Sequence, residues 1–100
     1  MELLKTLSQT VYPAKTAAYT GTAAATGTWA AGPQGVMVWS STDAYIEVGE
    51  GVTATTSSTP IPAYTPIPFA VPSGSGAPWY VSALQISTGG NVYAKPINIR

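Results

Sequence analysis

The fold is decided by residues 35–72, which read GVMVWSSTDAYIEVGEGVTATTSSTPIPAYTPIPFAVP. Residues 35–40 are a compact apolar segment that is typical of a β-strand. Residues 44–48 alternate, with Ala44, Ile46 and Val48 on one face and Tyr45 and Glu47 on the other. This alternation indicates a half-buried antiparallel strand. Because only a few polar residues separate the two segments, the pattern predicts a hairpin.

A glycine turn and a proline-rich segment follow. Gly49-Glu50-Gly51 tolerates positive φ, and residues 52–59 predict a polar loop that hydroxyl-to-backbone hydrogen bonds can order. Prolines at positions 60, 62, 66 and 68 exclude a helix and favour a sheet edge, because proline has no N–H to donate to a central ladder. We interpret the pair at 66 and 68 as a blunted edge. Pro60 and Pro62 are interpreted as a rigid strap that contacts a neighbouring molecule.

The remainder of the body continues the same pattern. Residues 73–77, SGSGA, predict a loop tip, and residues 79–87 are the longest alternating strand. Thr88-Gly89-Gly90-Asn91 predicts a tight hairpin turn. Residues 92–97 predict the returning strand, in which Pro96 indicates an edge of the sheet. Turn signals recur about every 8–12 residues, which is the pattern of a sandwich or small barrel. We therefore expect an all-β fold, a small antiparallel β-sandwich or barrel.

The first third of the chain predicts an extended N-terminal arm, residues 1–34, in front of a body of residues 35–100. Residues 9–19 contain Pro13 and suit an edge strand or an arm. Residues 20–32 are mostly Ala, Thr and Gly, which suits either a flexible linker or a strand of small residues.

Composition excludes most chemistry. The 100 residues include four basic and four acidic side chains, no histidine and no cysteine. So few basic residues provide no footprint for nucleic acid or for an anionic membrane surface. Ser-His-Asp and Cys-His arrangements and the common zinc sites are ruled out. Asp43 and Glu47 would lie about 13 Å apart along a strand, too far for a catalytic pair. We predict a non-enzymatic protein without cofactor or metal.

Targeting signals are equally sparse. The first residues lack the pattern of a secretory signal, and no apolar run approaches the length of about 20 residues that a membrane helix needs. We therefore expect a chain that stays in the cytoplasm of its host or is assembled there into something larger.

Three tryptophans and six tyrosines are the remaining candidates for binding. Such rings can stack on sugars, lie in the core or pair across strands as Trp39 and Tyr45 would, or anchor a protein interface. The candidates for partner contact are Tyr12, Tyr19, Trp29, Pro60, Pro62 and Trp79.

Three segments, YIEVGEGVTAT (residues 45–55), PIPAYTPIPFAVP (60–72) and VSALQISTGGNVYA (81–94), resemble small all-β virion proteins of tailed bacteriophages. In such chains a Val-Gly strand end, a T-A-T loop, a P-I-P-A step, an F-x-V-P strand and a Gly-Gly hairpin follow one another. The resemblance implies a capsid decoration or cement protein on the surface of the virion. It would bridge subunits of the major capsid protein as a homo-oligomer, often a trimer. The arm would then reach a neighbouring subunit, so that removal of the first 30 residues should weaken capsid binding.

Two other classes remain open. One is a head–tail adaptor or a fibre- or spike-associated protein, present in far fewer copies per virion than a decoration protein. The other is a carbohydrate-binding module, for which glycan binding would depend on Trp29 or Trp79.

Overall fold

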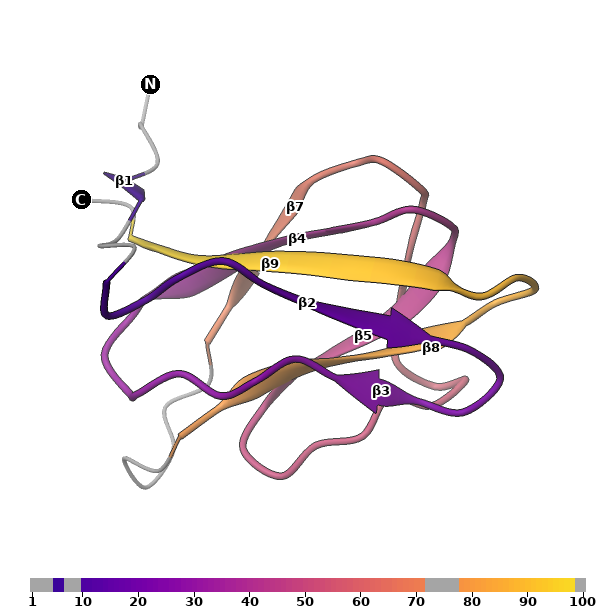
Figure 1. Ribbon diagram of the computed structural model, residues 1–100, viewed down its shortest axis with the longest axis horizontal. Coiled ribbons are helices and arrows are strands. Elements are labelled where there is room, and N and C mark those ends of the chain that lie inside the picture. The colour runs from indigo at the N-terminus through magenta and orange to yellow at the C-terminus, as the bar shows by residue number, and fades with distance from the viewer. Residues whose placement is uncertain (1–4, 7–9, 72–77, 99–100) are drawn as a thin grey trace.

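The computed structural model describes residues 5–6, 10–71 and 78–98, which form two antiparallel sheets packed face to face (Figure 1). Those ranges hold no helix, and hence none long and apolar enough to cross a membrane. The expected all-β sandwich is confirmed. The loop tip expected at residues 73–77 lies outside the described residues. The strands are β1 (Lys5–Thr6), β2 (Lys15–Tyr19), β3 (Ala24–Ala25), β4 (Gly35–Ser40), β5 (Ala44–Gly49), β6 (Thr59–Ile61), β7 (Ile67–Ala70), β8 (Tyr80–Gln85) and β9 (Gly90–Asn98).

The two sheets have corresponding strand orders. In sheet A, β7 pairs with β4, and β4 pairs with β9. The other edge of β9 pairs with β2 over one part of its length and with β1 over another. In sheet B the order is β3-β8-β5-β6. Apart from β1, each strand of sheet A is thus connected to the strand at the corresponding position of sheet B, as β2 is to β3 and β4 is to β5.

The chain therefore changes sheet after β2, β3, β4, β6, β7 and β8, and both predicted hairpins are wrong. β4 pairs with β7 and β9, and not with β5, while β8 pairs with β3 and β5, and not with β9. The alternation only requires that apolar faces meet. Here Val36 and Val38 of β4 meet Ala44 and Ile46 of β5 across the core instead of lying beside them in one sheet.

Four of the six crossing connections lie together at one end of the sandwich, which we call the arch end: residues 20–23, 41–43, 62–66 and 86–89. Four backbone hydrogen bonds join these connections to one another or to the adjacent strand ends: Gln85 to Thr20, Ser41 to Asn91, Ile86 to Asp43, and Tyr64 to Ser40. Figure 1 shows the β2–β3 and β8–β9 connections side by side at this end.

Gly89 and Gly90 have a different role from the one predicted. Neither has positive φ, which the primed hairpin turns require. A Cβ at Gly89 would lie 2.8 Å from the Tyr19 carbonyl oxygen, and one at Gly90 would lie 2.6 Å from Ser41 Oγ. These glycines are therefore needed for close approach at the arch end. The prediction of positive φ is confirmed at Gly49 and Gly51.

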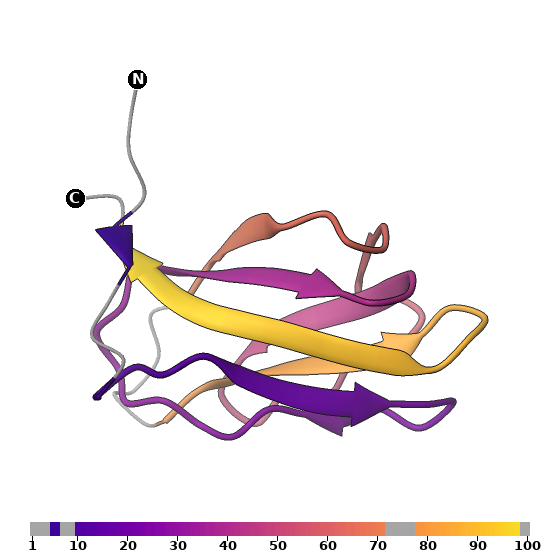
Figure 2. The same ribbon diagram turned by 45° about the horizontal axis from the view of Figure 1, so that its top comes forward.

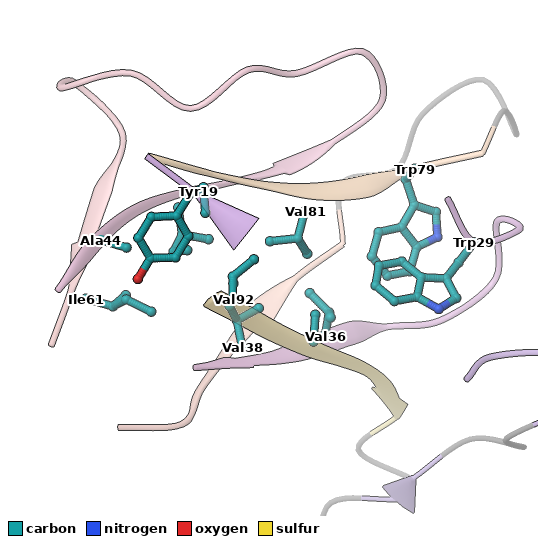
Figure 3. Close-up of a cluster of buried hydrophobic side chains, with 12 residues drawn as sticks. Tyr19, Trp29, Val36, Val38, Ala44, Ile61, Trp79, Val81 and Val92 are labelled. Carbon is teal, nitrogen blue, oxygen red and sulfur yellow. The ribbon is translucent and has the colours of Figure 1, made fainter. Parts of the chain in front are cut away.

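The core contains residues from the predicted arm as well as from the body. Tyr19 is 1% exposed and Trp29 is 2% exposed, and both lie in one cluster with valines of β4, β8 and β9 (Figure 3). β2 pairs with β9 over five residues, and β3 pairs with β8. The expectation that residues 1–34 stand apart from the body is thus wrong for residues 15–29, because their aromatic side chains complete the core. Of the two readings of residues 20–32, the strand of small residues is confirmed at β3.

Three prolines lie within the described strands, and two of them are at sheet edges. β6, with Pro60, is an edge of sheet B, and β7, with Pro68, is an edge of sheet A. The blunted edge predicted for Pro66 and Pro68 is therefore confirmed for Pro68, whereas Pro66 lies just before β7. The prediction for Pro96 is wrong, because β9 has neighbours on both sides. Pro96 falls between Ala94, the last residue paired with β2, and Ile97, the first paired with β1. It therefore occupies a break in that ladder.

The loop after β5 folds back over the outer face of sheet B. The Ala54 N–H donates to Ser82 Oγ at 2.9 Å, the Tyr80 hydroxyl to the Val52 carbonyl at 2.7 Å, and the Ser58 hydroxyl to a Glu47 carboxylate oxygen at 2.9 Å. Ala54 and Ser82 are both buried. The predicted ordering of this loop by hydroxyl groups is confirmed.

A candidate contact surface at the arch end

Half of the predicted contact residues lie in the core. Trp29 and Trp79 pair through two backbone hydrogen bonds, with ring centroids 4.9 Å apart, and Trp79 is 2% exposed. Their indole N–H groups donate to the carbonyls of Pro13 and Ala30. Tyr19 is equally buried, and its hydroxyl lies 3.0 Å from the Thr42 carbonyl oxygen. In this fold, none of the three offers its ring to a partner or a sugar.

The other three predicted residues remain accessible to different degrees. Tyr12 is half-buried beside Ala31, whereas Pro60 and Pro62 are exposed along the β6 edge. Pro62 begins the connection to β7, so it belongs to the arch end together with the residues described next.

Tyr64 is the most exposed large apolar residue on the arch end, with 72% of its surface accessible. Its backbone has φ of +56°, in the left-handed region that is an outlier for a bulky residue. Such a conformation costs about 1–2 kcal/mol. The ring forms no part of the core. Packing in the core therefore offsets neither the exposure of the ring nor the strain in the Tyr64 backbone.

Two residues hold Tyr64 in this position, one at the end of β4 and one in the β4–β5 connection. The Tyr64 N–H donates to the Ser40 carbonyl at 2.7 Å, and the Ala63 N–H donates to Asp43 Oδ1 at 2.9 Å. Prolines on both sides, at 62 and 66, restrict the backbone further. The ring is thus presented by a connection that is fixed at both ends.

Ile86 lies on the other side of Asp43 and is 41% exposed. Its N–H donates to the Asp43 carbonyl at 3.3 Å, so Asp43 joins the connection that bears Tyr64 to the one that bears Ile86. Asp43 is the one charged residue in the four connections, whose other exposed side chains include the hydroxyls of Thr20, Thr22, Thr65, Ser87 and Thr88. A nearly neutral surface with two exposed apolar groups suits contact with another protein better than it suits an ionic ligand.

A stacked aromatic pair lies on the adjoining outer face of sheet A. Trp39 and Tyr93 are opposite each other in register, with ring centroids 5.3 Å apart and planes 20° from parallel. Trp39 precedes Ser40, which accepts the hydrogen bond from Tyr64. Trp39 thus forms a cross-strand pair as predicted, but its partner is Tyr93 and not Tyr45, which lies in sheet B opposite Leu84 and Pro60.

Sequence reasoning missed Tyr64, Ile86 and Tyr93 as candidates for contact. A signal for Tyr93 was present, because it alternates with Val92 and Ala94 and must point away from them. For Tyr64, the signal was its place between two proline pairs, where a turn exposes whatever it carries.

Among residues 5–6, 10–71 and 78–98, no group of three or more carboxylate, histidine or cysteine side chains is placed to hold a metal ion. Comparisons of the chain with protein-family models, with curated protein sequences and with solved structures found no match.

Proposed function

We propose that this chain is a non-enzymatic structural protein of a tailed-phage virion, which binds the major capsid protein on the shell surface as a decoration or cement protein. The observation that carries the proposal is the arch end, where a strained and rigidly held Tyr64 is exposed on a nearly neutral surface. Exposed aromatic rings are the commonest anchors of protein interfaces. The sequence resemblance supplies the class of partner.

The electrostatics of the chain support this role. Many copies of a shell-coating protein bind side by side on the capsid, and strongly charged copies would repel one another. Here four basic and four acidic residues cancel, and the arch end carries Asp43 alone. Neighbouring copies can therefore crowd on one surface without a large electrostatic cost.

The fold changes the experiment that tests this role. Removal of the first 30 residues would delete β2, β3 and Trp29 and so disrupt the core, whatever the arm contacts. Point substitution at the arch end is the appropriate test, because Tyr64 can be truncated without loss of a core contact.

The test uses capsids of the phage that encodes the chain, prepared without it. Wild-type protein is added back, and bound copies are counted by quantitative mass spectrometry and located by electron cryomicroscopy. We expect density repeated over the whole shell. Density confined to the neck, a fibre or a spike would overturn the decoration role in favour of an adaptor, and no binding at all would overturn both.

Two variants examine the surface itself. Y64A should weaken capsid binding by about 30-fold, as expected for an anchor residue worth about 2 kcal/mol. V11A is the matched control, because Val11 is 59% exposed but precedes β2 at the opposite end of the sandwich. If both variants bind like the wild type, the arch end is not the contact surface.

A further inference from the structure

We propose that two copies of this chain associate through the free edge of β2, which would join their two copies of sheet A into one continuous antiparallel sheet. This inference rests on the strand edges, and is independent of what the arch end binds.

The edges of the two sheets are protected to different degrees. β6 and β7, on one side of the sandwich, contain Pro60 and Pro68, which have no N–H for another strand to accept. On the opposite side, β3 is only two residues long. β2 has five residues without proline, and its pairing with β9 leaves its other edge without a strand among the described residues (Figure 2).

An unpaired strand edge exposes a row of backbone donors and acceptors that another extended chain can satisfy. A second β2 is complementary to this row, because antiparallel pairing of a strand with itself gives a closed two-fold dimer. The register centred on Ala17 is the one that pairs all five residues. It places Lys15 opposite Tyr19 of the second copy and Thr16 opposite Ala18.

The charges of β2 fit this register. Lys15 is its one charged residue, and the two lysines of a pair would lie about four residues, roughly 13 Å, apart along the strands. This separation exceeds the Debye length of about 8 Å at physiological salt. The Lys15 ammonium also donates to the Thr28 carbonyl at 2.7 Å and lies 5.6 Å from the centre of the Trp29 ring, so it is held against its own chain.

The surroundings leave room for the second copy. Thr16 and Ala18 point to the solvent side of sheet A and are exposed, while Tyr19 is buried inward. Below them, Ala25, Gly27 and Thr28 are exposed along the neighbouring edge of sheet B. No large side chain from these segments would separate the two sandwiches.

The test introduces charge at two exposed positions that this register places opposite each other. In T16K/A18E, each introduced lysine faces an introduced glutamate of the second copy, whereas in T16K/A18K it faces a lysine. Both variants share the change at position 16, so any effect of that lysine on Lys95 of the neighbouring β9 is common to both. Circular dichroism and urea unfolding would establish that both variants fold.

Association is measured by sedimentation velocity from micromolar to millimolar protein. We expect wild-type dimers at the upper concentrations. Since a cross-strand charge pair occurs twice in the dimer, T16K/A18E should lower the dissociation constant by a factor of about 2 to 30, and T16K/A18K should raise it similarly. Added salt should reduce both effects.

Two outcomes would overturn the proposal. A wild-type chain that remains monomeric at millimolar concentration would show that the β2 edge does not pair with itself. The edge would then be available to an extended segment of a different protein. Dimers of equal affinity in both charge variants would place the interface elsewhere on the molecule.

Discussion

The two ends of the sandwich use aromatic residues in opposite ways. At the end away from the arches, Trp29 and Trp79 pack against each other inside the core with their ring planes tilted by 36°, and each indole N–H has a backbone acceptor. At the arch end, Tyr64 is exposed in a strained backbone conformation, with no core contact to offset the strain. Figure 3 shows the tryptophan pair at one end of the core and Tyr19 at the other, with valines between them.

This difference separates residues that stabilise the fold from residues that are free to bind. A buried aromatic side chain with satisfied polar atoms contributes to the free energy of unfolding. An exposed one on a strained turn lowers that free energy and is therefore a better candidate for contact with a partner. Truncation of the enclosed tryptophans should consequently lower the free energy of unfolding, whereas relief of the backbone strain at Tyr64 should raise it.

The largest effect is expected from W79A. Removal of a fully buried tryptophan should lower the free energy of unfolding by about 3–5 kcal/mol, measured by urea denaturation, since the cavity adds to the lost burial. W39A is the matched control, because Trp39 is half-buried on the outer face and its loss should cost about 1–2 kcal/mol. Equal losses of unfolding free energy in the two variants would show that the buried pair stabilises the fold no more than the half-buried Trp39 does.

An intermediate effect is expected from Y19F at the arch end. The Tyr19 hydroxyl lies 2.7 Å from Thr42 Oγ1 and 3.0 Å from the Thr42 carbonyl oxygen, which also accepts a bond from the Ser40 hydroxyl. Because that carbonyl keeps a donor, the loss should be about 1 kcal/mol. The ring stays in the core, so near-ultraviolet circular dichroism should be preserved. An unchanged midpoint in urea would mean that this hydrogen bond contributes nothing to the arch end.

The smallest effect, and the one of opposite sign, is expected from Y64G. Glycine relieves about 1–2 kcal/mol of left-handed strain and loses about 0.4–1 kcal/mol through the greater freedom of the unfolded chain, so stability should rise by up to about 1.5 kcal/mol. Y64A removes the same ring without relieving the backbone, and its stability should remain within about 0.5 kcal/mol of the wild type.

Capsid binding by the same two variants sharpens the comparison between the ends. Because both lack the ring, both should bind more weakly than the wild type, although one is more stable. If Y64G were destabilised, the ring would contribute to folding and the contrast between the two ends would fail.

The sequence predicted the individual strands better than their connections. The alternation of β5 was placed on the correct faces, because apolar and polar side chains alternate about a buried face wherever the strand lies. The connections after β4 and β8 were misassigned, because short polar turns serve equally to form a hairpin or to cross between sheets. Gly89 and Gly90 were recognised as necessary, but the reason is contact with Tyr19 and Ser41 rather than positive φ.

Residue type alone was insufficient to identify the residues of the candidate contact surface. Tryptophan and tyrosine are favoured both in cores and in interfaces, so the sequence could not separate Trp29 and Trp79 from Tyr64. The β-branched and aromatic pattern, the prolines and the scarcity of charge determined an all-β chain with blunted edges. Only the tertiary structure decided which aromatic residues are enclosed, because burial depends on which strands face one another across the core, and local alternation does not specify that.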